Sequence, residues 1–174
     1  MAALIAPHGG RLVDRWLRGP AREAALERAG RLRRVRLDAR EAADLEMIGD
    51  GALSPLTGFM TRADYQSVLG EMRLASGLLW ALPVTLAVAR EEAEAIRDGE
   101  EIALEDGSGR ILALMQVADR FVCDREAEAA RCYGTTDLRH PGVQRLLRQG
   151  EVCLGGDVWL LDRPPAPFAP YRLT

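Results

Sequence analysis

The sequence predicts a mixed α+β fold in which a β half-barrel carries short helices at its periphery. Short segments rich in apolar and β-branched residues are interleaved with four or five short helical segments. The chain has no G-x-G-x-x-G segment and no regular alternation of strand and helix, which excludes a doubly wound parallel sheet. Its 174 residues are enough to bury a sizeable core.

In the first part of the chain, two helix starts carry side chains suited to capping. Helices are expected over residues 20–29, 39–48 and 62–69, and a strand over 33–37. Asp38 with Glu41, and Thr61 with Asp64, each place an acid three residues after a cap residue, which predicts two capping boxes. Both helices should therefore begin where these pairs stand.

The second part of the chain is richer in strands. Strands are expected over residues 78–88, 102–104, 111–117 and 152–161, and helices over 91–97, 125–132 and 141–147. Asp106-Gly-Ser-Gly109 separates two of these strands and predicts a hairpin turn. Pro83 indicates an edge strand or a bulge. In the last helix, His140 is the expected N-cap, and the expected buried stripe is Val143, Leu146 and Leu147.

Charge and hydropathy exclude several classes of function. All 23 cationic residues are Arg, so no lysine can form a Schiff base or clamp a phosphate. The net charge of −3 argues against nucleic acid as a partner. The chain has no apolar run long enough to span a membrane and no basic, apolar leader at its start. A cytoplasmic location is therefore expected, without a membrane partner.

The three cysteines do not have the spacing of a metal site. Cys123, Cys132 and Cys153 form no C-x-x-C pair, and only two histidines could assist them. We therefore expect no zinc site. Cys123 and Cys153 lie in apolar strand-like runs, which favours buried, reduced thiols over a redox pair. The three tryptophans also lie in apolar segments and are expected in the core.

Two parts of different composition are expected along the chain. Residues 1–163 form the folded domain, and residues 164–174 contain four prolines that predict a stiff linker.

Several segments together resemble the ATP sulfurylase (sulfate adenylyltransferase) family, in the family's order and across nearly the whole chain. They are Pro7-His-Gly-Gly10, Leu12-Val13 with Arg15, Asp44-Leu-Glu46, Gly51-Ala-Leu-Ser-Pro-Leu-Thr-Gly-Phe-Met60, Asp64-Tyr65, Met72-Arg-Leu-Ala-Ser-Gly-Leu-Leu-Trp80, Pro83-Val-Thr-Leu86, Tyr133-Gly-Thr-Thr-Asp137, His140-Pro-Gly-Val143 and Leu154-Gly-Gly156. The sequence departs from the family by carrying Asp50 and Ser76 where Asn is more frequent, and Ala87 where an acid is frequent.

The resemblance implies a PUA-like amino-terminal domain that supports catalysis elsewhere in a longer protein. In the family, a second half binds ATP, with Mg, and sulfate through a Gln-x-Arg-Asn-Pro segment and a His-x-x-His pair. This chain has no Asn, and its two histidines are far apart in sequence. We therefore expect no catalytic residue and no cofactor in this chain. Its expected partners are its own catalytic domain and further copies in a homo-oligomer, and a fused adenylylsulfate kinase is left open.

Six residues are candidate functional residues. Three are candidates for substrate binding near the interface of the two halves, and three are candidates for a domain or subunit interface. For substrate binding these are His8, Arg15 and His140, although a turn around His8 and an N-cap role for His140 are the simpler alternatives. For the domain or subunit interface they are Leu56, Phe59 and Met60, large apolar residues in a loop with Pro and Gly. Packing of that loop in the core is the alternative.

Two other functions remain open at this point. The run Arg31, Arg33, Arg34 and Arg36 would serve a stand-alone RNA-binding PUA-like module. Alternation along a strand places Arg34 and Arg36 on one face and the other two on the opposite face, which divides the patch. The third possibility is a free-standing interaction subunit.

Overall fold

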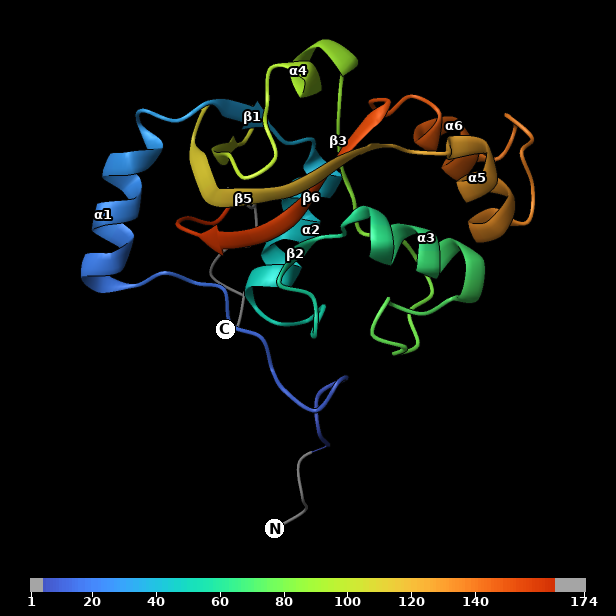
Figure 1. Cartoon of the computed structure of the whole chain (residues 1–174), viewed down its shortest axis with the longest axis horizontal. Coiled ribbons are helices and arrows are strands. Elements are labelled where there is room, and N and C mark those ends of the chain that lie inside the picture. The colour runs from blue at the N-terminus through green and yellow to red at the C-terminus, as the bar shows by residue number, and fades with distance from the viewer. Residues whose placement is uncertain (1–4, 165–174) are drawn as a thin grey trace. The chain divides into compact units, whose positions relative to one another are not determined.

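The computed structural model describes residues 5–164 and contains a mixed sheet and short helices, which Figure 1 labels. The strands are β1 (Arg34–Arg36), β2 (Gly58–Phe59), β3 (Leu86–Val88), β4 (Glu101–Glu105), β5 (Ile111–Val122) and β6 (Val152–Leu160). The helices are α1 (Gly19–Ala29), α2 (Ala39–Gly49), α3 (Arg62–Glu71), α4 (Arg90–Glu94), α5 (Arg125–Tyr133) and α6 (Pro141–Leu146). The strand order β1-β4-β5-β6-β2, with β3 paired to β6, is open, so this sheet is not a closed barrel. The predicted α+β class is confirmed.

The chain divides into two compact units. The first contains the residues up to Gly58, Glu101–Gln116 and the residues from Asp157 onward. The second contains Phe59–Glu100 and Val117–Gly156. Of the predicted linker 164–174, only the first residue is described, so that prediction lies outside the described residues.

The sheet of the first unit is built on two pairings of β4. β1 runs parallel to β4, with Val35 opposite Leu104, and β5 runs antiparallel to it. The predicted turn joins β4 and β5, because the Asp106 carboxylate accepts hydrogen bonds from the backbone N–H groups of Ser108 (2.8 Å) and Arg110 (3.1 Å). One cluster of its apolar core contains Ala25, Ala29, Ala103, Leu114 and Leu161.

Helix α2 of the first unit begins where its capping side chains predict. Asp38 Oδ1 accepts from the N–H of Glu41 (2.7 Å), and Glu41 Oε2 accepts from the N–H of Asp38 (2.9 Å). This confirms the first capping box and fixes the start of α2. The expected stripe of Ala42, Leu45 and Ile48 is buried.

In the second unit, three helices lie close together beside an antiparallel strand pair. β3 pairs with β6 with Leu86 opposite Leu154. α5 packs on α6 and on α3, as Figure 1 shows. Two of its apolar clusters contain Tyr65, Phe121, Cys123 and Cys153 in one case, and Ala129, Val143 and Leu146 in the other.

The second predicted capping box is wrong. The Thr61 side chain makes no capping bond to α3. The carboxylate of Asp64 accepts instead from the backbone N–H of Ala75 (2.9 Å), and the N–H of Arg62 donates to Asp119 (3.0 Å). Tertiary partners therefore replace the local pair at this helix start.

Two predicted elements are shorter than expected, and one stripe is incomplete. Only Leu86–Val88 of the predicted strand 78–88 is a strand, and proline at 83 removes a ladder donor before it. The helix expected over 91–97 is Arg90–Glu94. Leu147, expected to be buried, is 43% exposed and directly follows the last residue of α6. No described helix has the length and hydropathy of a membrane span, and the longest have 11 residues.

Candidate functional sites

The first unit contains a pocket of about 490 Å³ next to the end of α2. Its lining residues are Leu12, Asp14, Trp16, Arg18, Gly49, Asp50 and Arg163. They come from three separate stretches of the chain, so their spacing in the sequence does not predict the pocket. The expectation that the three tryptophans lie in the core is wrong, because Trp16, Trp80 and Trp159 are all only partly buried, and Trp16 lines this pocket.

Arg163 is held on the indole of Trp16 by two carboxylates. Its guanidinium lies 4.5 Å from the centre of the Trp16 ring. Its two terminal nitrogens donate to the Asp50 carboxylate at 2.8 and 3.0 Å, and one of them also donates to Glu46 at 2.7 Å. Trp16 Nε1 donates at 2.7 Å to Asp50 Oδ1, the oxygen that also accepts the 2.8 Å hydrogen bond from Arg163. The cation–π and charge-assisted contacts fix all four side chains.

Hydrogen bonds to Arg163 and Trp16 determine the ionisation of Asp50. Burial alone would raise the pKa of Asp50, but these hydrogen bonds outweigh it and lower the pKa below its ordinary value of 3.8. The Asp50 contact likewise raises the pKa of Arg163. The carboxylate is therefore ionised and paired at neutral pH, which suits a structural contact better than a general base.

The chain after α2 comes close to the backbone of the amino-terminal segment at Gly51. Gly51 has φ +78°, and a Cβ there would lie 2.3 Å from the carbonyl oxygen of Val13. The N–H of Val13 in turn donates to Ser54 Oγ (3.0 Å), which donates to the carbonyl of Gly51 (2.6 Å). Glycine is required here for both conformation and space.

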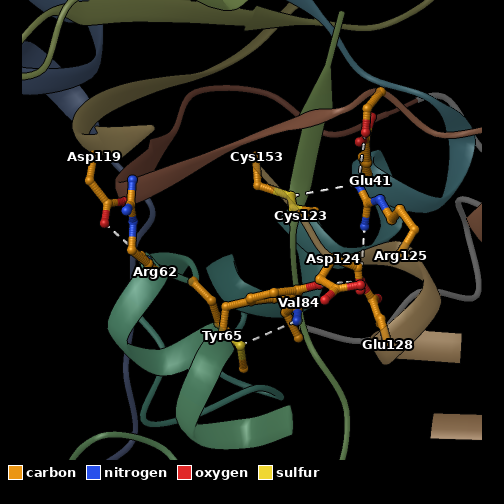
Figure 2. Close-up of a disulfide and its surroundings, with 12 residues drawn as sticks. Glu41, Arg62, Tyr65, Val84, Asp119, Cys123, Asp124, Arg125, Glu128 and Cys153 are labelled. Atoms are coloured by element: carbon orange, nitrogen blue, oxygen red, sulfur yellow. Dashed lines mark hydrogen bonds and ion pairs between the residues drawn. A yellow bond between two sulfur atoms is a disulfide. The ribbon is translucent and has the colours of Figure 1, made fainter. Parts of the chain in front are cut away.

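The second unit contains a buried disulfide (Figure 2). Cys123, just after β5, and Cys153, in β6, are bonded with their Cα atoms 6.1 Å apart. The expectation that both are reduced thiols is wrong, because the N–H of Cys123 donates to the carbonyl of Glu151 (3.0 Å) and brings the two cysteines side by side. Thirty positions separate them in sequence, so sequence reasoning had no local signal for the pair. Cys132 is free.

A polar group surrounds the disulfide, as Figure 2 shows. The Tyr65 hydroxyl donates to Glu128 Oε2 (2.9 Å), and Arg125 donates to the same oxygen (3.0 Å). Arg125 also reaches the carbonyl of Gly150 (3.0 Å) and lies 3.6 Å from Cys153 Sγ. Burial and the neighbouring Glu128 raise the pKa of Tyr65, so its hydroxyl stays protonated and donates. The group ties α3, α5 and β6 together.

The predicted substrate-binding candidates belong to different units, and each is described with its own contacts. His8 lies in the first unit, in a turn closed by the N–H of Gly10 donating to Pro7 (2.8 Å). Arg15, in the same unit, donates from Nε to the carbonyl of Val158 (2.7 Å) and lies over the Trp159 ring (4.6 Å). Both contacts join the amino-terminal segment to β6, and a substrate-binding role for Arg15 stays a prediction.

His140 lies in the second unit and caps α6, as expected. Its Nδ1 accepts from the N–H of Val143 at 3.4 Å. Its ring lies 5.0 Å from that of Tyr133, between ring centres. These contacts account for the residue without a substrate, and a substrate-binding role stays a prediction.

The predicted interface residues Leu56, Phe59 and Met60 are all buried. Their burial supports the alternative that the loop packs in the core, and their role at an interface stays a prediction. Among residues 5–164, no group of three or more His, Cys, Asp or Glu side chains could hold a metal ion.

Known proteins resemble this chain closely, over only part of their own length. The family model described as PUA-like domain matches residues 5–163. A sulfate adenylyltransferase of Symbiobacterium thermophilum is 83% identical over 174 residues, which is 100% of this chain and 44% of that protein. The sulfate adenylyltransferase of Nostoc punctiforme is 48% identical over 97% of this chain and 43% of its own.

The names of two further relatives include APS kinase. A probable bifunctional SAT/APS kinase 2 of Sorangium cellulosum is 48% identical over 92% of this chain and 28% of its own length. A solved structure described as a hexameric APS kinase from Thiobacillus denitrificans is 32% identical, with a TM-score of 0.76, over 98% of this chain and 30% of its own. The chain thus spans less than half the length of these relatives, and we call the rest their unmatched part.

Proposed function

Because the chain belongs to the PUA-like domain family, we propose that it is the amino-terminal supporting domain of a sulfate adenylyltransferase. The observation that carries the proposal is the 83% identity to the Symbiobacterium thermophilum sulfate adenylyltransferase along the entire chain. The reaction of such an enzyme is attack of a sulfate oxygen on the α-phosphorus of ATP, which forms adenylylsulfate and releases pyrophosphate.

We place ATP, with Mg, and sulfate in the unmatched part of the relatives. The Gln-x-Arg-Asn-Pro segment of the family requires an Asn, and this chain has none. Asp50 pairs with Arg163 and Glu128 pairs with Arg125, in each case within one unit. They are suited to holding the fold, whereas catalysis of nucleotidyl transfer needs cations directed at phosphate oxygens. The isolated chain should therefore be inactive.

We further propose that the whole protein is a cytoplasmic homo-oligomer. The description of the Thiobacillus denitrificans neighbour as hexameric supports the oligomer. A molar mass measured by light scattering that equals a single chain would contradict it.

The RNA-binding alternative has less support. Arg34 and Arg36 both pair with Glu105, at 3.4 and 3.3 Å, and Arg31 pairs with Glu27 at 3.3 Å. An arginine already paired with a carboxylate contributes less to phosphate binding, because the pair must be broken first. We therefore favour the enzyme domain.

A chimera tests the proposal directly. This chain is joined to the unmatched part of the Symbiobacterium thermophilum relative, and pyrophosphate release from ATP is measured with and without sulfate. We expect sulfate-dependent release by the chimera and none by the 174-residue chain. An inactive chimera that is folded by circular dichroism would contradict the proposed function, as would activity of the chain alone.

A further inference from the structure

The second unit contains another, smaller pocket, of about 210 Å³. Its lining residues are Arg62, Arg90, Ala93, Glu94, Arg120, Phe121, Val122 and Val152. Arg62 is the first residue of α3, Arg90 is the first residue of α4, and Arg120 lies in β5, the elements so labelled in Figure 1. Three cations from three separate elements therefore meet at one small cavity, which we call the three-arginine pocket.

Two of these arginines are already held by exposed carboxylates. Arg90 donates from Nε to Glu151 at 3.0 Å. Arg120 donates from Nε to Asp98 at 2.7 Å and from Nη1 to the carbonyl of Ala93 at 3.0 Å. The two carboxylate side chains are 65% and 57% exposed. Both arginines are therefore oriented before a ligand binds, and their charges are balanced.

Arg62 differs from the other two arginines because its guanidinium has no carboxylate partner among residues 5–164. Its Nη2 donates to the carbonyl of Arg120 at 3.0 Å, and its guanidinium lies 6.0 Å from the centre of the Phe121 ring. Its backbone N–H donates to Asp119 at 3.0 Å, as Figure 2 shows. Nε and Nη1 make no hydrogen bond within the described part of the chain. These two nitrogens are adjacent donors of the kind that hold a carboxylate.

The rest of the pocket lining is mostly apolar. Ala93, Phe121 and Val152 are buried, whereas Val122 is 62% exposed. The N–H of Cys123 donates to the carbonyl of Glu151 at 3.0 Å, so the end of β5 lies beside the start of β6. At about 30 Å³ for each water-sized group, the pocket has room for roughly seven such groups. The lining and the volume both suit a short aliphatic body.

The balance of charge limits the ligand to a single negative charge. Glu94 lines the pocket, and together with Glu151 and Asp98 it supplies as many carboxylates as there are arginines. A phosphate or a nucleotide carries several negative charges, which these carboxylates repel. A monocarboxylate carries one, and it can accept two parallel hydrogen bonds from one guanidinium. Charge therefore disfavours phosphates and favours a carboxylate at Arg62.

We propose that the three-arginine pocket binds a small monocarboxylate with a branched aliphatic body. Arg62 binds the carboxylate through the two nitrogens that make no other contact, and the apolar lining covers the aliphatic body. The carbonyl of Arg120 holds the guanidinium of Arg62 in place for this contact. The proposal does not depend on the proposed function, because every residue it uses belongs to the second unit and the test contains neither ATP nor the rest of an enzyme.

A methyl NMR titration of the 174-residue chain with 3-methylbutanoate at constant ionic strength tests the proposal. The methyl signals of Val122 and Val152 should shift in a saturable way, with a dissociation constant of about 10 mM or tighter. The neutral 3-methylbutanamide has the same shape and should bind at least about tenfold more weakly, because it forms no charge-assisted pair. Absence of saturable shifts, or equal affinity for the amide, would overturn the proposal. Sulfate that competes with equal or higher affinity would overturn the assignment to a carboxylate.

Three substitutions give a second readout with a matched control. Arg62→Gln should weaken binding of 3-methylbutanoate at least about tenfold. Glu94→Gln should tighten it about threefold, because it removes a negative charge from the lining. Arg139→Gln removes the same charge at an exposed arginine that pairs with Asp137 in the same unit, and it should leave binding unchanged.

The outcomes of these substitutions separate a specific site from a general effect of charge. Equal weakening by Arg62→Gln and Arg139→Gln would overturn the proposal. If Arg62→Gln does not fold, the exposed Glu94→Gln variant decides: tighter binding supports the site, and unchanged or weaker binding overturns it.

Discussion

Reduction of the Cys123–Cys153 disulfide should lower the stability of the second unit. The bond joins two positions 30 residues apart, between which α5 and α6 lie. Breaking it lets this stretch move freely in the unfolded chain. The unfolded state therefore gains entropy, and the folded state becomes less stable relative to it.

The size of the effect follows from the closed loop. For about 30 residues, the loop entropy is roughly 12 cal/mol/K, which corresponds to about 3.6 kcal/mol at 25 °C. At about 2–4 °C per kcal/mol for a chain of this size, the melting temperature should fall by roughly 7–14 °C.

The assay is urea unfolding with and without a phosphine reductant, followed by tryptophan fluorescence. The double variant Cys123→Ala with Cys153→Ala should lower the free energy of unfolding to a similar extent and should be insensitive to the reductant. Cys132→Ala is the matched control, because this cysteine is free, and it should keep the full response.

Thiol counting checks the bond independently. In denaturant without reductant, iodoacetamide should label Cys132 alone, and after reduction it should label all three cysteines. Labelling of all three before reduction, or an unfolding free energy that does not change on reduction, would refute the reasoning.

Three further changes probe the contacts of the two units. Tyr65→Phe removes the hydroxyl that donates to buried Glu128 and should cost about 1–2 kcal/mol in urea unfolding; an unchanged midpoint would contradict the assigned hydrogen bond. Asp50→Asn should lower the free energy of unfolding at pH 7 by only about 1 kcal/mol, because the contact with Arg163 is partly exposed. Since the pKa of Asp50 is lowered in the folded state, that cost should persist above pH 3.8 and disappear as the pH falls further, which a pH series of melting curves measures. Gly51→Ala should cost at least about 2 kcal/mol more than Gly99→Ala, because both have positive φ but only the first Cβ meets backbone; equal melting temperatures would refute the close approach.

Local sequence signals predicted the elements whose contacts are local. The capping pair at Asp38 and Glu41 fixes α2, and the Asp106 turn joins β4 to β5. In both cases the side chain bonds to backbone within four residues, so the pattern contains its own partner. The same reasoning failed at Thr61, where the partners come from residues 75 and 119.

The features of the candidate sites depend on contacts that are distant in sequence. Asp50 and Arg163 are 113 positions apart, and Tyr65 and Glu128 are 63 apart. No spacing rule connects such residues until the sheet brings them together. The apolar runs around Cys123 and Cys153 predicted that both thiols are buried and reduced. Composition predicts burial but does not show which buried residues are neighbours, so the disulfide was missed.

Binding of ATP tests most directly whether this chain supports the reaction without holding its nucleotide. Isothermal titration with ATP and Mg²⁺ compares the 174-residue chain with the chimera at the same concentration. We predict saturable binding to the chimera and no saturable binding to the chain. Equal, stoichiometric binding of ATP to the chain alone would contradict the account, because it would place the nucleotide site within these residues.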